Sequence, residues 1–242
     1  MAAMPFENQI KSIAFDADDT LWVNEPNYNE IEQAFAELLS PYLSSDEVSR
    51  RLLAAEKRNL PIFGYGAKAF MLSMIETAIE LTAGRVRGQE IQRIINMGKE
   101  MLSRPIQLLD GVQHVLDSLE EDYALMVLTK GDLLDQESKI ARSGLSRYFQ
   151  YVEIVSEKKA EVYRRILERH GWQPEEFVMI GNSLRSDILP VLAIGAYAIH
   201  IPAEITWQHE QVPEAEVADK HFMRLQKISQ VLEHFETPIR HS

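Results

Sequence analysis

The stretch Ser12–Thr20 reads SIAFDADDT, and its two halves differ in character. The half Ser12–Phe15 is a short and mainly apolar run, whereas most of the remainder is acidic. A short apolar run bounded by polar residues is typical of a buried β-strand. Ligands of open parallel sheets bind beyond the carboxyl ends of the strands. The stretch therefore predicts a buried strand that delivers Asp16 and Asp18 to the ligand-binding edge of a sheet.

Strand and helix patterns alternate in the part of the chain that follows residue 105. One helical pattern, at 136–143, stops at Gly144 in the manner of a C-cap. Strands are expected at 124–128, 152–155, 177–180 and 197–201, with a final helix at about 222–235. Because strands that alternate with helices form mainly parallel sheets, we expect an α/β fold with a doubly wound, Rossmann-like sheet.

Residues 23–104 show a different, purely helical pattern. Apolar side chains such as Ile31 and Phe35 recur at the spacing that places them on one helix face. No strand pattern interrupts this segment. We therefore expect an all-helical domain at 23–104, inserted into an α/β core that consists of residues 1–22 and 105–242.

Two local signals divide the helical segment. Ser44 and Glu47 have the spacing of a capping box, which predicts a helix start. Further on, Leu60–Gly66 reads LPIFGYG, and its proline and glycines predict a loop between two helices. Loops on a rigid scaffold often carry recognition, so Tyr65 and the nearby Lys68 are candidate ligand contacts. The same two residues also fit a plain turn followed by a surface lysine.

The composition excludes several classes of function. Lys and Arg total 25 against 37 Asp and Glu, and the formal net charge of −12 disfavours nucleic-acid binding. The chain has no cysteine, which excludes disulfides, thiolate metal sites and cysteine nucleophiles. No stretch approaches the roughly 20 apolar residues of a membrane helix, and residues 1–11 do not resemble a signal peptide. We expect a cytoplasmic protein that does not bind membranes.

Polar residues that could bind a ligand or take part in a reaction follow each of the first four predicted strands. In chain order they are Asp16, Asp18 and Asp19; Thr129, Lys130, Gly131 and Asp132; Ser156, Glu157, Lys158 and Lys159; and Gly181, Asn182, Ser183 and Asp187. The carboxyl ends of parallel strands meet at one edge of a sheet. We therefore expect acids, a hydroxyl and a lysine to converge there.

These residue types fit phosphoryl transfer through a covalent acyl phosphate. Asp16 would provide the carboxylate nucleophile, as in known aspartyl-phosphate enzymes. Asp18, two residues on, would protonate the leaving alkoxide and later deprotonate the attacking water. Mg²⁺ held by oxygen ligands would mask the negative charge that keeps a carboxylate from an anionic phosphate. Thr129, the Gly131 backbone and a lysine would hold the phosphate oxygens.

With these residues in this order, the chain resembles the haloacid dehalogenase superfamily of aspartyl-nucleophile phosphatases over about residues 13–201. The first family motif, Asp-x-Asp-x-Thr after a strand, is present at Asp16–Thr20. The second, a Thr or Ser after the next core strand, matches Thr129, and the fourth, an acid-rich turn, matches Gly181–Asp187. Four motifs in order are a specific signal. The resemblance implies a phosphatase with an α-helical cap at 23–104, between the first and second motifs.

The third family motif is a lysine that opens a helix, and the chain offers two adjacent lysines for it. Lys158 is preferred, because its register to Val162 and Tyr163 is similar to that of the family, and Lys159 is the alternative. The phosphate-binding residues that follow from the resemblance are Thr129, Lys130, Gly131 and Lys158.

The fourth motif departs from the family at Asn182, where an acid is more common. An amide oxygen can still order a metal-bound water, but it brings no charge. The resemblance implies an Mg²⁺ site formed by Asp16, Asp187, Asn182 and the backbone carbonyl of Asp18, and it places more of the binding on the two carboxylates.

The sequence thus predicts a magnesium-dependent phosphomonoester hydrolase that acts on a small phosphorylated metabolite. Its alternatives are a 2-haloacid dehalogenase, a phosphomutase and a non-catalytic binding or regulatory protein with a degenerate site. Asp18 argues against the first, and Asn182 is the only hint of the last. The substrate is left open, since the segment Phe15–Leu21 is similar to pyrimidine 5′-nucleotidases and phosphoglycolate-type phosphatases alike.

Overall fold

The computed structural model describes residues 10–205, 207, 217 and 220–235, and they form two compact units. The first unit contains the described residues of Met1–Val23, Ile106–Lys130 and Ile140–Ser242. The second contains Asn24–Pro105 and Gly131–Lys139. Within the described part of the chain, no helix has the length and apolar character needed to cross a membrane.

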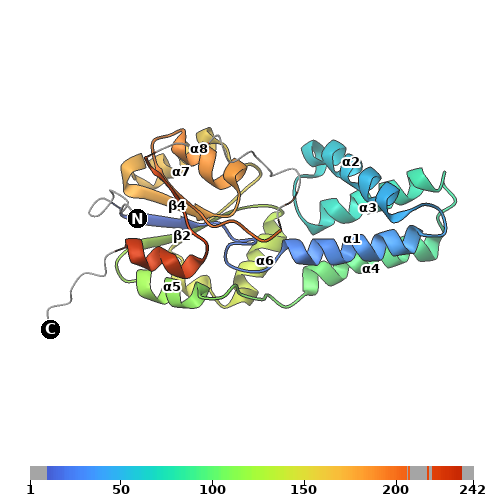
Figure 1. Ribbon diagram of the computed structural model, residues 1–242, viewed down its shortest axis with the longest axis horizontal. Coiled ribbons are helices and arrows are strands. Elements are labelled where there is room, and N and C mark those ends of the chain that lie inside the picture. Colours follow the sequence, from blue (N-terminus) through green and yellow to red (C-terminus); the bar gives the residue numbers. More distant parts are fainter. Residues whose placement is uncertain (1–9, 206, 208–216, 218–219, 236–242) are drawn as a thin grey trace. The chain divides into compact units, whose positions relative to one another are not determined.

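The first unit is built on a parallel sheet of six strands in the order β3-β2-β1-β4-β5-β6 (Figure 1). The strands are β1 (Ser12–Phe15), β2 (Ala124–Lys130), β3 (Tyr151–Val155), β4 (Phe177–Gly181), β5 (Tyr197–His200) and β6 (Phe222–Arg224). The order runs outward from β1 in one direction to β3 and in the other direction to β6. This is the doubly wound α/β fold expected from the sequence.

Helices cover both faces of the sheet, which explains why its central strands are apolar on both sides. Ile13 and Phe15 pack into a core cluster with α5 (Val112–Leu119) on one face. Ala14, between them, packs into a second cluster on the opposite face. The helices there are α7 (Ala160–His170), the π-helical turn η3 (Leu184–Ile188) and α8 (Leu189–Leu192). Successive β1 residues therefore alternate between two buried layers.

The register of the sheet places Asp16 at the point where the strand order reverses. Phe15 pairs with Val127 of β2 on one side and with Ile180 of β4 on the other. The backbone N–H of Asp16 donates to the carbonyl of Ile180 at 2.9 Å. Ligands of doubly wound sheets bind at such a switch point, beyond the carboxyl ends of the strands.

The second unit is helical in its described residues. It contains α1 (Glu25–Leu39), α2 (Ser45–Phe63), α3 (Ala67–Leu81), α4 (Gly88–Ser103) and the first part of α6 (Leu133–Ser143). The first four helices share an apolar core of their own, whose buried members include Ile31, Phe35, Leu52, Phe70, Met74 and Ile94. The core explains the helical spacing of apolar residues in this segment.

The final segment corrects one expectation. The sequence pattern predicts a single helix at about 222–235, but the structure has strand β6 at Phe222–Arg224 and the 3₁₀-helix η5 at Ile228–His234. Residues of β6 pair in parallel with β5, Phe222 opposite Ala198 and Met223 opposite Ile199. This pairing satisfies backbone groups that β5 would otherwise leave open at the edge of the sheet, and local sequence cannot show it.

The loop predicted at Leu60–Gly66 is shorter than expected, because α2 continues through Pro61 to Phe63. The break comes at Gly64, whose φ of +72° suits glycine and whose N–H donates to the Leu60 carbonyl at 3.0 Å. Pro61 lacks an N–H, so it removes one helical hydrogen bond in the last turn. A proline so near the end disturbs little of the helix, and the loop shrinks to Gly64–Gly66.

The capping box expected at the start of α2 does not form. Ser44 is the N-cap residue, but its side chain makes no capping hydrogen bond. Glu47 instead pairs with Arg50 at 2.6 Å and with Arg51 at 2.9 Å. These basic partners lie one helical turn further on, and they outcompete the backbone N–H of Ser44 for the carboxylate.

Candidate active site

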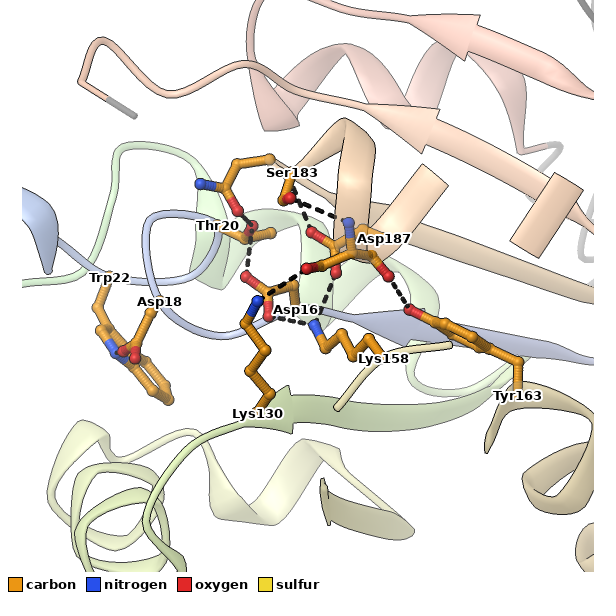
Figure 2. Close-up of polar contacts among 11 residues, drawn as sticks. Asp16, Asp18, Thr20, Trp22, Lys130, Lys158, Tyr163, Ser183 and Asp187 are labelled. Carbon is orange, nitrogen blue, oxygen red and sulfur yellow. Dashed lines mark hydrogen bonds and ion pairs between the residues drawn. The ribbon is translucent and has the colours of Figure 1, made fainter. Parts of the chain in front are cut away.

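Asp16 lies buried just after β1, where the side chains of Lys158 and Thr20 contact it (Figure 2). The Lys158 ammonium donates to its Oδ1 atom at 2.5 Å, and the Thr20 hydroxyl donates to its Oδ2 atom at 3.2 Å. The strand holds the backbone of Asp16 through Ile180, so the side chain points into a fixed polar environment.

Lys158 joins Asp16 to Asp187. Its ammonium lies 2.5 Å from Oδ1 of Asp16 and 2.7 Å from Oδ1 of Asp187. Lys158 is 4% exposed, whereas Lys159 is exposed and forms the N-cap of α7. Of the two candidate lysines, Lys158 is therefore the one that meets both carboxylates.

This buried cluster contains two carboxylates, Asp16 and Asp187, and one ammonium, Lys158, so its charges do not balance. Burial raises the pKa of Asp16 to about 7; Lys158 opposes the rise and Asp187 adds to it. Burial lowers the pKa of Lys158, but the charges of Asp16 and Asp187 outweigh it and hold that pKa above its ordinary value. Two carboxylates thus share one ammonium, so a cation beside Asp16 would be electrostatically favoured.

The turn after β4 fixes Asp187, which is 1% exposed. The N–H of Ser183 donates to Oδ2 of Asp187 at 3.0 Å, and the N–H of Asp187 donates back to the Ser183 carbonyl at 2.8 Å. The Tyr163 hydroxyl donates to the Ser186 carbonyl at 3.0 Å. Asp187 lies in the π-helical turn η3, a rare conformation that occurs frequently at functional sites.

Asn182 lies near Thr20, which also contacts Asp16. The Thr20 hydroxyl oxygen is 3.5 Å from Oδ1 of Asn182 and 3.2 Å from Oδ2 of Asp16. His200, on β5, donates from Nε2 to the Asn182 carbonyl at 2.9 Å, because a carbonyl can only accept. An amide oxygen and a carboxylate oxygen therefore lie around one hydroxyl.

These oxygens fit a hard divalent cation. Among the described residues, no three His, Cys, Asp or Glu side chains are grouped to hold a metal by themselves. The Asp16 and Asp187 carboxylates and the Asn182 amide nevertheless supply oxygen atoms in this cluster. All are oxygen donors, which Mg²⁺ prefers, and the surplus negative charge of the cluster favours a cation.

Asp18 has a partner that the sequence reading missed. The Trp22 indole Nε1–H donates to Oδ1 of Asp18 at 2.7 Å. Figure 2 shows this pair to one side of the group formed by Asp16, Lys158 and Asp187. The spacing of four residues between Asp18 and Trp22 was visible in the sequence, but a tryptophan there reads as an ordinary core residue.

The end of β2 brings Lys130, but not the Thr129 hydroxyl, into this hydrogen-bond network. Lys130 Nζ donates to the Ser186 hydroxyl at 2.8 Å, next to Asp187 (Figure 2). Thr129 is 1% exposed, and no hydrogen bond among the described residues joins it to Asp16. Gly131 has a φ of +155°, which favours glycine, and a Cβ there would lie 2.9 Å from the Gln136 side chain.

Tyr65 and Lys68 belong to the second unit, where Lys68 has an acidic partner. Its ammonium lies 2.8 Å from Oδ1 of Asp132, and this contact lowers the pKa of Asp132. Gly66, at a φ of +111°, lies against Asp132, since a Cβ would be 3.4 Å from that of Asp132. The loop that contains Tyr65 and Gly66 thus lies against Asp132.

A family model supports the sequence resemblance. The model of haloacid dehalogenase-like hydrolases matches residues 10–195 of this chain. The match includes Asp16, Asp18, Thr129, Lys158 and Asp187.

Curated relatives carry the names of phosphatases. A glyceraldehyde 3-phosphate phosphatase from Methanothermobacter thermautotrophicus is 32% identical over 133 residues, which is 50% of this chain and 58% of that protein. A pyrimidine 5′-nucleotidase, PynA, from Streptococcus pneumoniae is 36% identical over 94 residues, 36% of this chain and 40% of that protein. The matched regions therefore span about half of each relative.

A solved structure is similar over nearly the whole chain. It is that of a haloacid dehalogenase-like family hydrolase from Xanthomonas campestris, with a TM-score of 0.82 and 44% sequence identity. The match covers 92% of this chain and 88% of that one.

Proposed function

Because this chain belongs to the haloacid dehalogenase-like hydrolase family, we propose that it is a magnesium-dependent phosphatase of small phosphorylated metabolites. The observation that carries the proposal is the buried Asp16 carboxylate at the switch point of the sheet, joined through Lys158 to Asp187. The names of the curated relatives support the reaction class. We further infer that it acts in the cytoplasm.

The proposed reaction has two displacements at phosphorus. A carboxylate oxygen of Asp16 attacks phosphorus, the bond to the ester oxygen breaks, and Asp18 gives its proton to that oxygen. Water then attacks phosphorus, Asp18 takes a proton from it, and the acyl-phosphate bond breaks. Inorganic phosphate leaves, and both carboxyl groups return to their starting state.

Residues at and after the ends of β2 and β3 would hold the phosphoryl group. Lys158 already contacts Asp16, and Lys130 is held by Ser186 beside Asp187. Thr129 and the Gly131 N–H would add neutral donors from the end of β2. The positive charges of the two lysines and the hydrogen bonds from all four groups would stabilise the charge of the phosphoryl oxygens as the bonds rearrange.

Mg²⁺ would be held by the Asp16 and Asp187 carboxylates, the Asn182 amide and the Asp18 carbonyl. When bound, it supplies positive charge that masks the repulsion between Asp16 and the phosphate. Asn182 contributes an oxygen without charge, so the two carboxylates provide the electrostatic part of the binding.

We propose that residues 23–104 act as a helical cap that chooses the substrate. The first unit supplies the reacting groups and leaves few side chains to read the rest of a metabolite. Tyr65 and Lys68, in and after the loop between α2 and α3, are the candidate contacts. Tyr65 can stack or donate a hydrogen bond, and Lys68 can meet a second anionic group of the substrate.

A phosphate-release assay over a panel of phosphorylated metabolites tests the function. The panel includes glyceraldehyde 3-phosphate and pyrimidine 5′-monophosphates, after the relatives' names. We expect release with Mg²⁺ and loss of release with EDTA. Asp16→Asn keeps the shape of the side chain but removes the nucleophile, so its kcat should fall at least about a thousandfold. A folded Asp16→Asn protein with a tenth of the wild-type kcat would exclude covalent catalysis by Asp16.

A further inference from the structure

Trp22 holds the side chain of Asp18 through one hydrogen bond. Its Nε1–H donates to Oδ1 of Asp18 at 2.7 Å (Figure 2). The side chain of Asp18 is half-buried, whereas Trp22 is 1% exposed and belongs to the core cluster of the sheet. The Asp18 side chain is thus hydrogen-bonded to an indole whose position is fixed by packing.

The backbone around Trp22 is held from two sides. The N–H of Asp19 donates to the Trp22 carbonyl at 2.8 Å, which closes the loop between the acids and the tryptophan. A bridge joins Trp22 to Leu108, and the N–H of Leu109 donates to the Leu21 carbonyl at 3.0 Å. The indole is therefore anchored by its packing and by its backbone, so it cannot follow a movement of Asp18.

Rotation of Asp18 away from Trp22 is unfavourable for the same reason. The indole N–H is a donor only, and a buried donor without a partner is energetically costly. The tie therefore restricts Asp18 to orientations that keep the contact with Trp22. Asp18 lies only two residues from Asp16, which sits at the end of β1, so the restriction also fixes one acid relative to the other.

We propose that Trp22 is a positioning residue that fixes Asp18 for proton transfer to the ester oxygen and from the attacking water. This inference rests on the proposed function, because it assigns Trp22 a role in that same reaction. Positioning of a catalytic group is worth a large part of a barrier, and small misplacements lower rates strongly. A purely structural tryptophan would instead affect all substrates alike.

Two aryl esters that differ by one nitro group separate these roles. Phenyl phosphate needs a proton for its leaving oxygen much more than p-nitrophenyl phosphate does. With Trp22→Phe we expect kcat/KM to fall about tenfold for phenyl phosphate and less than about threefold for p-nitrophenyl phosphate. Trp172→Phe is the matched control, because that indole packs against Tyr151 and Phe177. It should change both values less than about twofold.

A double mutant shows whether Trp22 acts through Asp18. In an Asp18→Asn background, the further change Trp22→Phe should no longer distinguish the two esters. A selective loss that persists without the Asp18 carboxylate overturns the proposal. Equal losses on both esters in the single variant, or a gain on phenyl phosphate, also overturn it.

The hydrogen bond has a readout that does not require the Trp22→Phe protein to fold. The chain has three tryptophans, and the variants Trp172→Phe and Trp207→Phe assign the indole N–H signals of the ¹⁵N-labelled protein. Asp18→Ala should move the Trp22 signal upfield and leave the Trp172 signal in place. An unmoved Trp22 signal means that the contact is absent, and the proposal fails.

The failure of this inference is distinct from failure of the proposed function. A wild-type protein that releases no phosphate from either ester or from the metabolite panel overturns the function, and the role of Trp22 falls with it. An active wild-type protein whose Trp22→Phe variant shows no selectivity overturns the role of Trp22 alone.

Discussion

The Asp187 carboxyl occupies the space that a side chain at position 181 would need. A Cβ on Gly181 would lie 2.4 Å from Cγ of Asp187, closer than real Cβ contacts come. Gly181 has an ordinary backbone conformation, so the requirement for glycine is one of space. The last residue of β4 thus lets an acid fold back over the end of its own strand.

Gly181→Ala should therefore displace Asp187 and weaken its contact with Lys158. We expect kcat/KM to fall at least about tenfold, or ~1.4 kcal/mol, and the Mg²⁺ needed for half-maximal activity to rise. Activity titrated against Mg²⁺ measures both. Gly88→Ala is the control, since a Cβ there meets no atom within 4 Å and the residue begins α4. Equal behaviour of the two variants would contradict the steric argument.

The adjacent lysines provide a matched pair for testing the buried ion cluster. Lys158→Met leaves Asp16 and Asp187 buried without their ammonium, and removing one partner of such a cluster costs about 3–5 kcal/mol of unfolding free energy. Lys159→Met, at an exposed position, should stay within about 0.5 kcal/mol. Urea unfolding of both proteins measures the difference. Similar stabilities would show that Lys158 does not neutralise the pair.

Asn182→Asp tests how charge sets metal affinity. The new carboxylate would lie near Thr20 and Asp16, and it adds one negative charge to the proposed oxygen ligands. We expect apparent Mg²⁺ affinity to rise about three- to tenfold, or ~1 kcal/mol. In EDTA the same variant should melt at a lower temperature than the wild-type protein, because like charges then face each other. Unchanged affinity and melting would remove Asn182 from the ligand set.

Lys68→Ala and Asp132→Asn separate substrate contact from ion pairing. The pair is partly exposed, with side chains 42% and 30% accessible, so either change should cost less than ~1 kcal/mol of stability. If Lys68 meets a second anion, Lys68→Ala raises KM several-fold for the natural ester and leaves acetyl phosphate unchanged. Asp132→Asn keeps the ammonium, so its KM should not rise. A parallel rise in both variants would assign the effect to the ion pair.

The sequence predicted the parts of the fold that depend on short local patterns. The apolar run before Asp16 indicated a buried strand, and the structure has β1 there with both neighbours parallel to it. The order of strands and helices was enough to predict the doubly wound class. Crossover connections between parallel strands are right-handed, so few topologies are compatible with that order. The sequence also predicted that polar residues after β1, β3 and β4 lie close together, because the carboxyl ends of parallel strands meet at one edge of the sheet.

Features that depend on contacts between distant residues were out of reach. Strand β6 exists because β5 pairs with it, and its three residues carry no strand signal of their own. The space needed at Gly181 depends on the rotamer of Asp187, six residues on. The bond between Trp22 and Asp18 needs the loop to close. The register to Val162 and Tyr163 favoured Lys158 over Lys159, but the burial that separates the two lysines depends on the packing around them.

The outer strands of the sheet, β3 and β6, have a consequence for aggregation. An exposed edge strand is a template on which another chain can pair, and proteins blunt it with charge and with short length. On one side, Glu153 of β3 holds Arg169 at 2.8 Å and His170 at 3.1 Å. On the other, the three residues of β6 end in Arg224. Both outer strands therefore offer little for edge-to-edge growth, which favours solubility at the high concentrations of recombinant expression.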